Sequence, residues 1–304
     1  MEDMSLKVGA QYKLAERLGC GAFGEIYAAT NGLTGQKVAV KLEPVHAKHP
    51  QLEYEARVYE RMSGKIGIPR VYYFGREGPH YILVMDRLGA NLEDLFNRCN
   101  RRFSMQTTLL LADKMLSVLE RVHAEGFIHR DLKPDNFLVG FPSNSGISDD
   151  AADKLLIYLV DFGLSKCFWN PDTDTHIPYR TGKSLTGTPR YASIRNHKGC
   201  EQSRRDDLES IGYILVYFVK GGLPWQNMAG VTKKARYKKM METKENAFPD
   251  LVEGLPSEFK MYFKTIFSLE FTGTPKYKKL RDLFRAVYNR LEYSLESAHY
   301  DWSA

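Results

Sequence analysis

The spacing of apolar residues changes part-way along this chain of 304 residues. Before residue 88, short apolar runs such as 38–41 and 81–85 have the length of strands and are separated by turns that contain glycine. Beyond residue 89, apolar residues recur every three or four positions, which is the period of a helix with one face in a core. The clearest stripe consists of Leu109, Ala112, Leu116, Leu119 and Val122. A strand-rich part therefore precedes a helical part, and residues 86–89 are the expected connection.

The composition is typical of a globular protein, with 43% hydrophobic residues, 26% charged residues and a net charge of +6. A chain of this length can bury a sizeable core, as one large domain or as two lobes. Its cysteines, Cys20, Cys99, Cys167 and Cys200, form no Cys-x-x-Cys pair and suggest neither a zinc site nor a disulfide framework. No signal-peptide pattern and no apolar run of about 18 residues occurs, so we expect a cytoplasmic protein without a membrane segment.

A glycine pattern lies between the first two expected strands, where Gly19, Gly21 and Gly24 follow the spacing Gly-x-Gly-x-x-Gly. Glycine lets the backbone approach phosphate groups closely and adopt positive φ. The pattern is weak evidence by itself, because dinucleotide-binding folds also use it, but in those folds a helix opens directly after the loop. Here residues 25–28 continue as a strand, and a turn at residues 31–35 leads to the strand that carries Lys41. This order favours a flap over ATP.

A charged helix is predicted at residues 51–62, after the strand of Lys41. One of its glutamates could hold Lys41 against the phosphates of a nucleotide. Glu55 is the preferred candidate, because Glu53 and Glu60 fall on other parts of the helix. The alternative is that all three glutamates are simply solvated.

Two motifs with carboxylates follow in the helical part. His-Arg-Asp-Leu-Lys-Pro-Asp-Asn occupies residues 129–136, and Asp-Phe-Gly occupies residues 161–163. Asp131 is placed to take a proton from a hydroxyl, Lys133 and Asn136 follow at short spacing, and Asp161 supplies a second carboxylate. These are the parts that phosphoryl transfer requires, because that reaction depends on positioning and charge neutralisation. The alternative is that these four residues and Lys41 are ordinary surface or core residues. All five would then have to occur at these spacings by chance.

With these motifs in order, residues 12–291 resemble a eukaryotic protein kinase, and several longer strings resemble the casein kinase 1 family. The strings are His-Pro-Gln-Leu (49–52), Leu-Glu-Asp-Leu-Phe-Asn (92–97), Lys-Pro-Asp-Asn-Phe-Leu (133–138), His-Ile-Pro-Tyr-Arg (176–180) and Glu-Gln-Ser-Arg-Arg-Asp-Asp-Leu-Glu-Ser (201–210). The resemblance implies an α+β, bilobal protein-kinase fold, with a β-rich N-lobe and hinge at residues 12–88 and a helical C-lobe at 89–291. Residues 292–304 are then a C-terminal extension, which we expect to be frayed or loosely docked, without a separate regulatory domain.

The resemblance also implies a serine/threonine protein kinase that uses ATP and Mg²⁺. Asp131 would orient the substrate hydroxyl and accept its proton, and Lys133 would lie near the γ-phosphate. Asn136 and Asp161 would hold two Mg²⁺ ions, and Lys41, supported by Glu55, would contact the α- and β-phosphates. Thr188 matches the residue that bridges Asp131 and Lys133 in kinases.

The same resemblance predicts a nucleotide pocket, which ATP-competitive inhibitors would share. Met85 would be the gatekeeper at the back of the adenine site. The pocket residues carried over are Leu18, Gly19, Gly21, Gly24, Ile26, Ala39, Lys41, Met85, Asp86, Leu88 and Leu138.

The chain departs from the general kinase pattern where most kinases have Ala-Pro-Glu. Ser-Ile-Arg occupies residues 193–195, so the usual Glu–Arg pair that supports the substrate loop is expected to be missing. The casein kinase 1 family departs in the same way, with Asn at the position of Arg195. Two features depart from the family itself: Pro189, and a spacer of 25 positions between Asn136 and Asp161, which we expect to be a surface loop.

The resemblance further implies protein substrates with acidic or phosphorylated residues near the target Ser or Thr. The family's anion site carries over to Arg190, Asn227 and Arg236, and guanidinium groups suit phosphate well. The basic cluster at residues 233–239 could attract acidic peptides, act as a nuclear-entry signal or form a solvated helix face, so a nuclear location stays open beside the cytoplasmic one. Nucleic-acid binding is not expected, because no stacking aromatics interleave with the cluster.

Two other classes of function compete with an active protein kinase. A pseudokinase scaffold predicts damage at Lys41, Asp131, Asn136 or Asp161, and all four are intact. A small-molecule phosphotransferase could share the fold, but the intact substrate segment at residues 184–193 and the arginines of the anion site favour protein targets.

Overall fold

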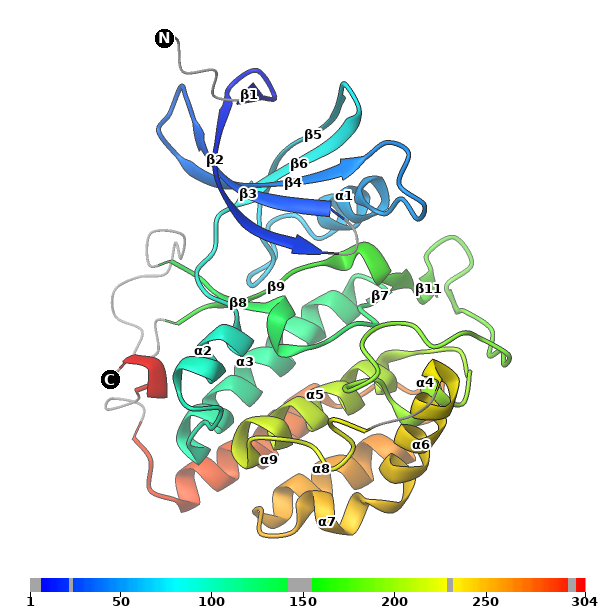
Figure 1. The fold of residues 1–304 in the computed structure, drawn as a ribbon. Helices are drawn as coiled ribbons and strands as arrows, with labels where there is room; N and C mark the ends of the chain where they lie inside the picture. The colour runs from blue at the N-terminus through cyan, green and yellow to red at the C-terminus, as the bar shows by residue number, and fades with distance from the viewer. Residues whose placement is uncertain (1–6, 22–23, 142–154, 229–231, 295–298, 304) are drawn as a thin grey trace. The chain divides into compact units, whose positions relative to one another are not determined.

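The computed structural model describes residues 7–21, 24–141, 155–228, 232–294 and 299–303 (Figure 1). The chain forms two compact units. The first consists of Met1–Gly89 with Tyr158–Leu164, and the second of Ala90–Ile157 with Ser165–Ala304. The sequence analysis had placed every residue after 88 in the second part, so the short segment that contains Asp161 differs from that expectation.

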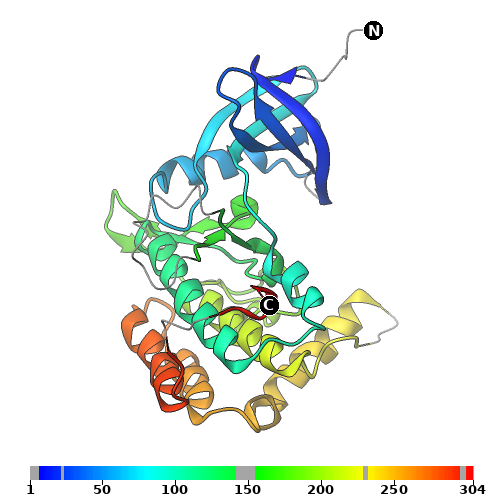
Figure 2. The same ribbon diagram turned by 90° about the vertical axis from the view of Figure 1, so that its left-hand side faces the viewer.

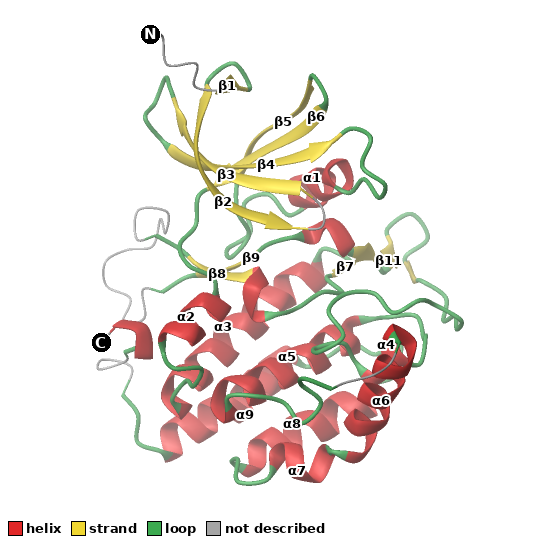
Figure 3. Ribbon diagram, viewed as in Figure 1, coloured by secondary structure: helices red, strands yellow, loops and turns green. Residues whose placement is uncertain are grey.

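The first unit is built around a six-stranded antiparallel sheet with the strand order β1-β2-β3-β4-β6-β5 (Figure 3). The strands are β1 (Lys7–Val8), β2 (Tyr12–Gly21), β3 (Gly24–Asn31), β4 (Lys37–Pro44), β5 (Val71–Glu77) and β6 (His80–Asp86). Alternating residues of β4 explain its place in the middle of the sheet. Val38 and Val40 are fully buried in a cluster with Ala29 and Val84. The side chain of Lys41 lies on the opposite face of the sheet and is therefore available for the site described below.

The predicted turn after β3 is present, and its residues account for it. The Asn31 side chain accepts a hydrogen bond from the backbone of Leu33 at 2.9 Å, and Gly35 donates its N–H to the Asn31 carbonyl at 2.8 Å with φ of +74°. Asparagine and glycine favour this geometry, because one caps its own turn and the other tolerates positive φ.

One helix, α1 (Leu52–Arg61), packs along β5 and β6 and contacts the 3₁₀ turn η3 (Phe162–Leu164). Its first turn is anchored by Glu43 of β4, whose carboxylate accepts the backbone N–H groups of Gln51 and Leu52 at 2.9 and 3.0 Å. A carboxylate at a helix N-terminus satisfies free donors and opposes the positive end of the helix dipole. The anchor holds α1, and with it Glu55, at a fixed place beside the sheet.

The second unit is mostly helical, with α3 in contact with both α5 and α9, and α8 in contact with α5 and α9 (Figure 2). Its helices are α2 (Leu92–Arg98), α3 (Met105–Ala124), α4 (Ile194–His197), α5 (Arg204–Lys220), α6 (Lys233–Asn246), α7 (Phe248–Val252), α8 (Ser257–Ser268) and α9 (Tyr277–Arg290). Short strands and turns complete the chain: β7 (Phe127–Ile128), η1 (Pro134–Asn136), β8 (Phe137–Val139), β9 (Ile157–Leu159), β10 (Lys166–Cys167), β11 (Trp169–Asn170), β12 (Thr175–His176) and η4 (Asp301–Ser303).

The α5 helix is buried along nearly its whole length, as its sequence predicts. At its start, the Asp206 side chain accepts the backbone N–H of Ser203 at 2.8 Å, and the Asp206 N–H donates to the Ser203 carbonyl at 3.0 Å. The helix ends at Gly221, which has φ of +82°, because glycine reverses the chain at a helix end without steric cost.

The end of the chain is held more firmly than expected. The Asp301 carboxylate accepts the backbone N–H of Ser104 at 2.6 Å, and the Asp301 N–H donates to the Thr107 hydroxyl at 3.1 Å. The Trp302 ring lies 5.2 Å from that of Phe103. Of the two alternatives expected for the end of the chain, frayed or loosely docked, the structure shows docking for residues 300–303, which pack at the start of α3.

Two expectations fall outside the described residues: the polar loop at residues 143–150, and the tip of the glycine loop at residues 22 and 23. The described residues otherwise form a strand-rich unit followed by a helical one. This confirms the α+β, bilobal kinase fold class.

Candidate active site

In the first unit, Lys41 forms ion pairs with two acidic residues. Its ammonium Nζ lies 2.7 Å from Glu55 Oε2 of α1 and 3.0 Å from Asp161 Oδ1. Glu55 is 1% exposed and Lys41 is 9% exposed, so water screens this contact little. The ion pair expected between Lys41 and Glu55 is present, and the expected choice of Glu55 over its neighbours agrees with its buried position.

Burial and neighbouring charges together determine the pKa values of Lys41 and Glu55. Burial opposes the charged form of Lys41, but Glu55 and Asp161 more than offset that effect, so its pKa is raised above the usual range. Burial raises the pKa of Glu55, and the Lys41 ammonium counteracts part of the rise. Lys41 is thus a permanent positive charge, which suits a residue that contacts phosphate.

Asp161 stands in a conformation that a non-glycine residue adopts rarely, with φ of +67°. Its N–H donates to the Tyr59 hydroxyl at 3.2 Å, and the next residue, Phe162, packs edge-on against the Tyr59 ring with centroids 5.1 Å apart. Such strain persists only where neighbouring contacts hold it, and it collects at functional sites. α1 therefore fixes both Glu55 and the backbone that carries Asp161.

The glycine loop joins β2 and β3, with Gly19 paired to Ile26 and Gly21 to Gly24. Only glycine fits at Gly24, because φ is +140° and an added Cβ would lie 2.1 Å from the carbonyl oxygen of Leu42. Nothing lies within 4 Å of a Cβ added at Gly19. The backbone of this loop is therefore accessible at Gly19 and packed tightly onto β4 at Gly24.

The other predicted pocket residues of the first unit lie on β2, β4, β6 and the segment after β6. Leu18 is 46% exposed, Met85 is buried, and Ala39 pairs with Met85 across β4 and β6. Asp86, expected in the connecting segment, instead ends β6. Its carboxylate accepts the Arg70 N–H and the Tyr72 hydroxyl. Leu88 follows it and is partly buried, and Leu138 belongs to the second unit, on β8.

In the second unit, the Asp131 carboxylate is held by three hydrogen bonds. Its Oδ1 accepts both the backbone N–H and the hydroxyl of Thr188, each at 2.7 Å. Its Oδ2 lies 3.2 Å from the ammonium of Lys133. Asn136 donates its side-chain N–H to the Asp131 carbonyl at 3.0 Å. The catalytic residues predicted in the second unit therefore form one hydrogen-bonded group, which includes Thr188.

The loop that carries Asp131 is held by hydrogen bonds from its backbone to Asp207 of α5. This buried carboxylate accepts the N–H groups of His129 and Arg130 at 2.7 and 2.9 Å, and its Oδ2 also lies 2.9 Å from His123 Nε2. Burial opposes ionisation of Asp207, but the hydrogen bond and charge of His123 lower its pKa overall. Arg130 has φ of +69°, so Asp207 stabilises a strained turn beside Asp131.

Asn136 and Asp161 have the oxygen donors that Mg²⁺ prefers. The Asn136 amide nitrogen donates to the Asp131 carbonyl, which leaves its oxygen available as the atom that would contact Mg²⁺. In the described ranges no group of three or more His, Cys, Asp or Glu residues is arranged for a metal ion. Mg²⁺ does not require one, because it is usually bound by one or two protein oxygens together with water and substrate phosphates. The donor set therefore fits.

The three anion-site residues lie in the second unit but differ in surroundings. The Arg190 guanidinium lies over the rings of Tyr191 and Tyr217, at 5.8 and 5.9 Å from the centroids. Arg236 is exposed on α6 over the ring of Tyr237, and Asn227 has φ of +63°. The contacts found among the described residues do not join the two arginines. The other basic residues of the 233–239 cluster, Lys233, Lys234, Lys238 and Lys239, form an exposed helix face.

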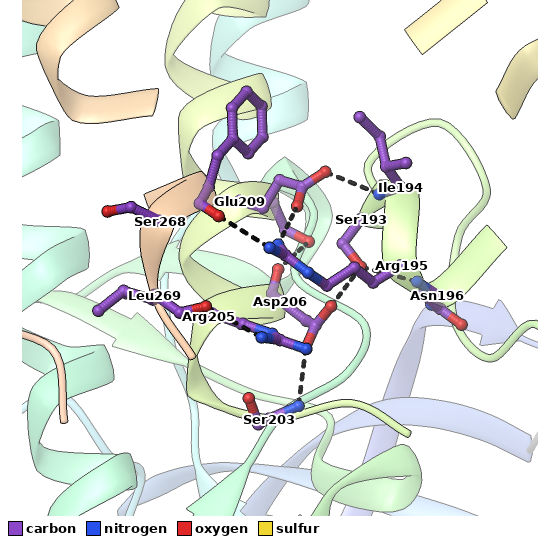
Figure 4. Close-up of polar contacts among 12 residues, drawn as sticks. Ser193, Ile194, Arg195, Asn196, Ser203, Arg205, Asp206, Glu209, Ser268 and Leu269 are labelled. Atoms are coloured by element: carbon purple, nitrogen blue, oxygen red, sulfur yellow. Dashed lines mark hydrogen bonds and ion pairs between the residues drawn. The ribbon is translucent and has the colours of Figure 1, made fainter. Parts of the chain in front are cut away.

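The usual Glu–Arg pair cannot form behind the substrate segment, because Arg195 stands where its glutamate would be, and the structure gives Arg195 a carboxylate partner on α5 (Figure 4). Arg195 Nη1 lies 3.9 Å from Oε2 of the buried Glu209, and Arg195 Nη2 donates to the Phe267 carbonyl at 2.8 Å. Glu209 also accepts the N–H of Ile194 at 2.7 Å. A pair is therefore present with its charges exchanged: the segment supplies the arginine and α5 supplies the glutamate.

Two residues with clear roles in this geometry were not singled out from the sequence. Asp207 and Glu209 both lie in the string at 201–210, which served only to indicate the family. The available signal was the presence of carboxylates in a helix predicted to be largely buried, because charged residues in a buried helix are rare unless they are paired.

A family model for the protein kinase domain matches residues 12–279 of the chain. The described part of the chain contains no helix that is long and apolar enough to cross a membrane. The match covers both units and includes every motif from the glycine loop to the α5 helix. This protein therefore belongs to the protein kinase family.

Proposed function

We propose that this protein kinase transfers the γ-phosphate of ATP to serine and threonine hydroxyls of proteins, and that it prefers targets with acidic or phosphorylated neighbours, as casein kinase 1 enzymes do. The observation that carries the proposal is the group formed by Asp131, Lys133 and Thr188. Thr188 occupies Oδ1 of Asp131, so Oδ2 is the oxygen left to accept a hydroxyl proton. The Lys133 ammonium beside it offsets the charge of the transferred phosphate.

The residues of the first unit supply the other requirement, a fixed positive charge for ATP. Lys41 would contact the α- and β-phosphates, and Glu55 and Asp161 keep its side chain in place. Mg²⁺ held by Asn136 and Asp161 would neutralise the phosphate oxygens when bound. All residues that a pseudokinase would lack are intact and hydrogen-bonded, which favours an active enzyme over a scaffold. Its use of ATP makes the cytoplasm or the nucleus the expected location.

The preference for acidic or phosphorylated targets rests on Arg190 and Arg236. Arg190 also packs against two aromatic rings, so its replacement would disturb packing, whereas Arg236 is exposed. We expect Arg236→Gln to raise KM for a peptide with a phosphoserine beside the target by on the order of tenfold, because a charge-assisted hydrogen bond to phosphate is lost. For the same peptide without the phosphate, KM should stay within about twofold of the wild-type value, because that peptide has no phosphate contact to lose.

Steady-state kinetics with this peptide pair test the assignment. Lys239→Gln is the matched control, because Lys239 is also exposed on α6 and lies outside the predicted anion site. It should leave the ratio between the two peptides unchanged. Equal losses on both peptides for Arg236→Gln would argue against a phosphate site and for general attraction by the basic cluster.

A further inference from the structure

Lys244, a buried residue of α6, donates to the segment that precedes α4. It is 2% exposed. Its ammonium donates to the Pro189 carbonyl at 2.9 Å and to the Ala192 carbonyl, and it lies 3.2 Å from His197 Nε2. Burial and the charge of Lys244 lower the pKa of His197 to about 4, so its ring is neutral. His197 Nε2 also lies 3.2 Å from the Pro189 carbonyl oxygen, so Lys244 and His197 both contact that carbonyl.

The ammonium also lies over two aromatic rings. It is 5.0 Å from the centroid of Tyr213 and 5.1 Å from that of Trp225, within the range of cation–π attraction. Trp225 in turn donates its indole N–H to the Arg190 carbonyl at 2.7 Å. The carbonyls of Pro189, Arg190 and Ala192 are thus held by Lys244 or by the indole beneath it.

Glu209 of α5 holds the following residues. It is fully buried, and its Oε1 accepts the Ile194 N–H at 2.7 Å (Figure 4). The same oxygen accepts the Tyr213 hydroxyl at 2.7 Å. Tyr213 therefore connects the two charges, because its hydroxyl bonds Glu209 while its ring lies under Lys244. Burial lowers the pKa of Lys244 and raises that of Glu209, and each charge opposes the shift of the other.

A buried charge is costly unless it is paired and hydrogen-bonded. An apolar side chain of similar length at residue 244 would fill the same space against Tyr213 and Trp225. What such a residue would lack is the set of donors that reaches the carbonyls of Pro189 and Ala192. The chemistry specific to Lys244 is therefore directed at the backbone of residues 184–193, the segment that the kinase resemblance assigns to the protein substrate.

We propose that Lys244 and Glu209 are positioning residues that shape the substrate segment for peptide binding, with Lys244 holding the carbonyls of Pro189 and Ala192 and Glu209 holding the N–H of Ile194. The proposal rests on the proposed function, because it assumes that this segment binds the peptide. The two residues act from α6 and α5 and hold the segment without a covalent modification of the chain. Arg195 is only partly buried, and its long contact of 3.9 Å with Glu209 makes it the minor contributor.

The first test compares Lys244→Met with Lys239→Met. Both changes remove a lysine from α6, but Lys239 is exposed. For Lys244→Met we expect kcat/KM for a peptide to fall on the order of 10- to 100-fold, carried mainly by a higher KM for the peptide, because the segment loses its shape by a fraction of an ångström or more. KM for ATP should be unchanged, since Lys244 lies outside the first unit. Lys239→Met should match the wild type in both constants. Equal peptide KM in the two variants overturns the proposal.

The second test uses Glu209, and it decides the question if Lys244→Met fails to fold. Glutamine keeps an oxygen that can accept from Ile194, whereas methionine does not. Glu209→Gln should therefore retain a peptide KM closer to the wild type than Glu209→Met does. A purely structural role would lower the thermal midpoint of both variants and leave their peptide KM values equal, and that result would contradict the proposal.

The double variant Lys244→Met with Glu209→Gln adds a measure of coupling. Because each charge compensates the other, the loss of peptide kcat/KM in the double variant should be smaller than the product of the losses in the two single variants.

A wild-type protein that transfers no phosphate to any peptide would contradict the proposed function. An active wild type whose Lys244 and Glu209 variants keep the normal peptide KM would sink only this inference.

Discussion

Asp131→Asn is expected to reduce phosphate transfer on the order of 10²- to 10⁴-fold, enough to abolish it in an ordinary assay, because the variant loses the carboxylate that accepts the hydroxyl proton. The fold should tolerate the change. An asparagine oxygen can still accept both hydrogen bonds from Thr188, which are 2.7 Å long in the wild type. We expect the thermal midpoint to move by less than about 4 °C.

The measurement is transfer of labelled phosphate to casein, with the thermal midpoint recorded on the same samples. Asp135→Asn is the matched control, because it makes the same chemical change four residues along the loop at an exposed position. It should behave like the wild type. Transfer by Asp131→Asn at the wild-type rate would contradict the assignment of Asp131.

Lys41→Met should have the second largest effect. The variant loses the one positive charge that Glu55 and Asp161 both contact, and with it the electrostatic support expected for the ATP phosphates. A preorganised donor of this kind contributes roughly 10²- to 10³-fold to turnover. Glu55 would be left buried without its counter-ion, but because burial already raises its pKa, it can take up a proton and remain in place.

Initial rates at varied ATP concentration provide the measurement for Lys41→Met. Lys37→Met is the control, since Lys37 lies on the same strand but is exposed and donates only to the Thr30 hydroxyl among the contacts found for it. It should keep the wild-type rate. If Lys41→Met also kept that rate at every ATP concentration, the role of Lys41 would have to be abandoned.

The sequence predicted those features whose signal is local or periodic. The strand period, the Asn31 turn and the helical stripe of α3 all appear as expected. The Lys41–Glu55 contact was predictable as well, because a single helix follows the strand and only one of its glutamates shares the right face. These features depend on a few neighbouring residues and need no knowledge of distant contacts.

Features that depend on tertiary contacts could not be predicted in the same way. Lys244 lies in a lysine-rich stretch whose other members are exposed, so its sequence gives no sign that it is buried against Tyr213 and Trp225. Arg195 and Glu209 belong to two separate sequence motifs, and neither motif by itself predicts that their side chains form a pair. The docking of Asp301 at the start of α3 spans nearly 200 positions, from Ser104 to the chain's end.

The most direct test of the central claim is an assay with one peptide in which only the acceptor is varied among serine, threonine and tyrosine. Each version would be offered with MgATP in acidic, pre-phosphorylated and basic contexts, and the site of modification read by fragment mass spectrometry. The account predicts phosphate on serine and threonine, most rapidly in the acidic and pre-phosphorylated contexts, and none on tyrosine. Transfer to tyrosine at a similar rate, or the highest rate in the basic context, would contradict it.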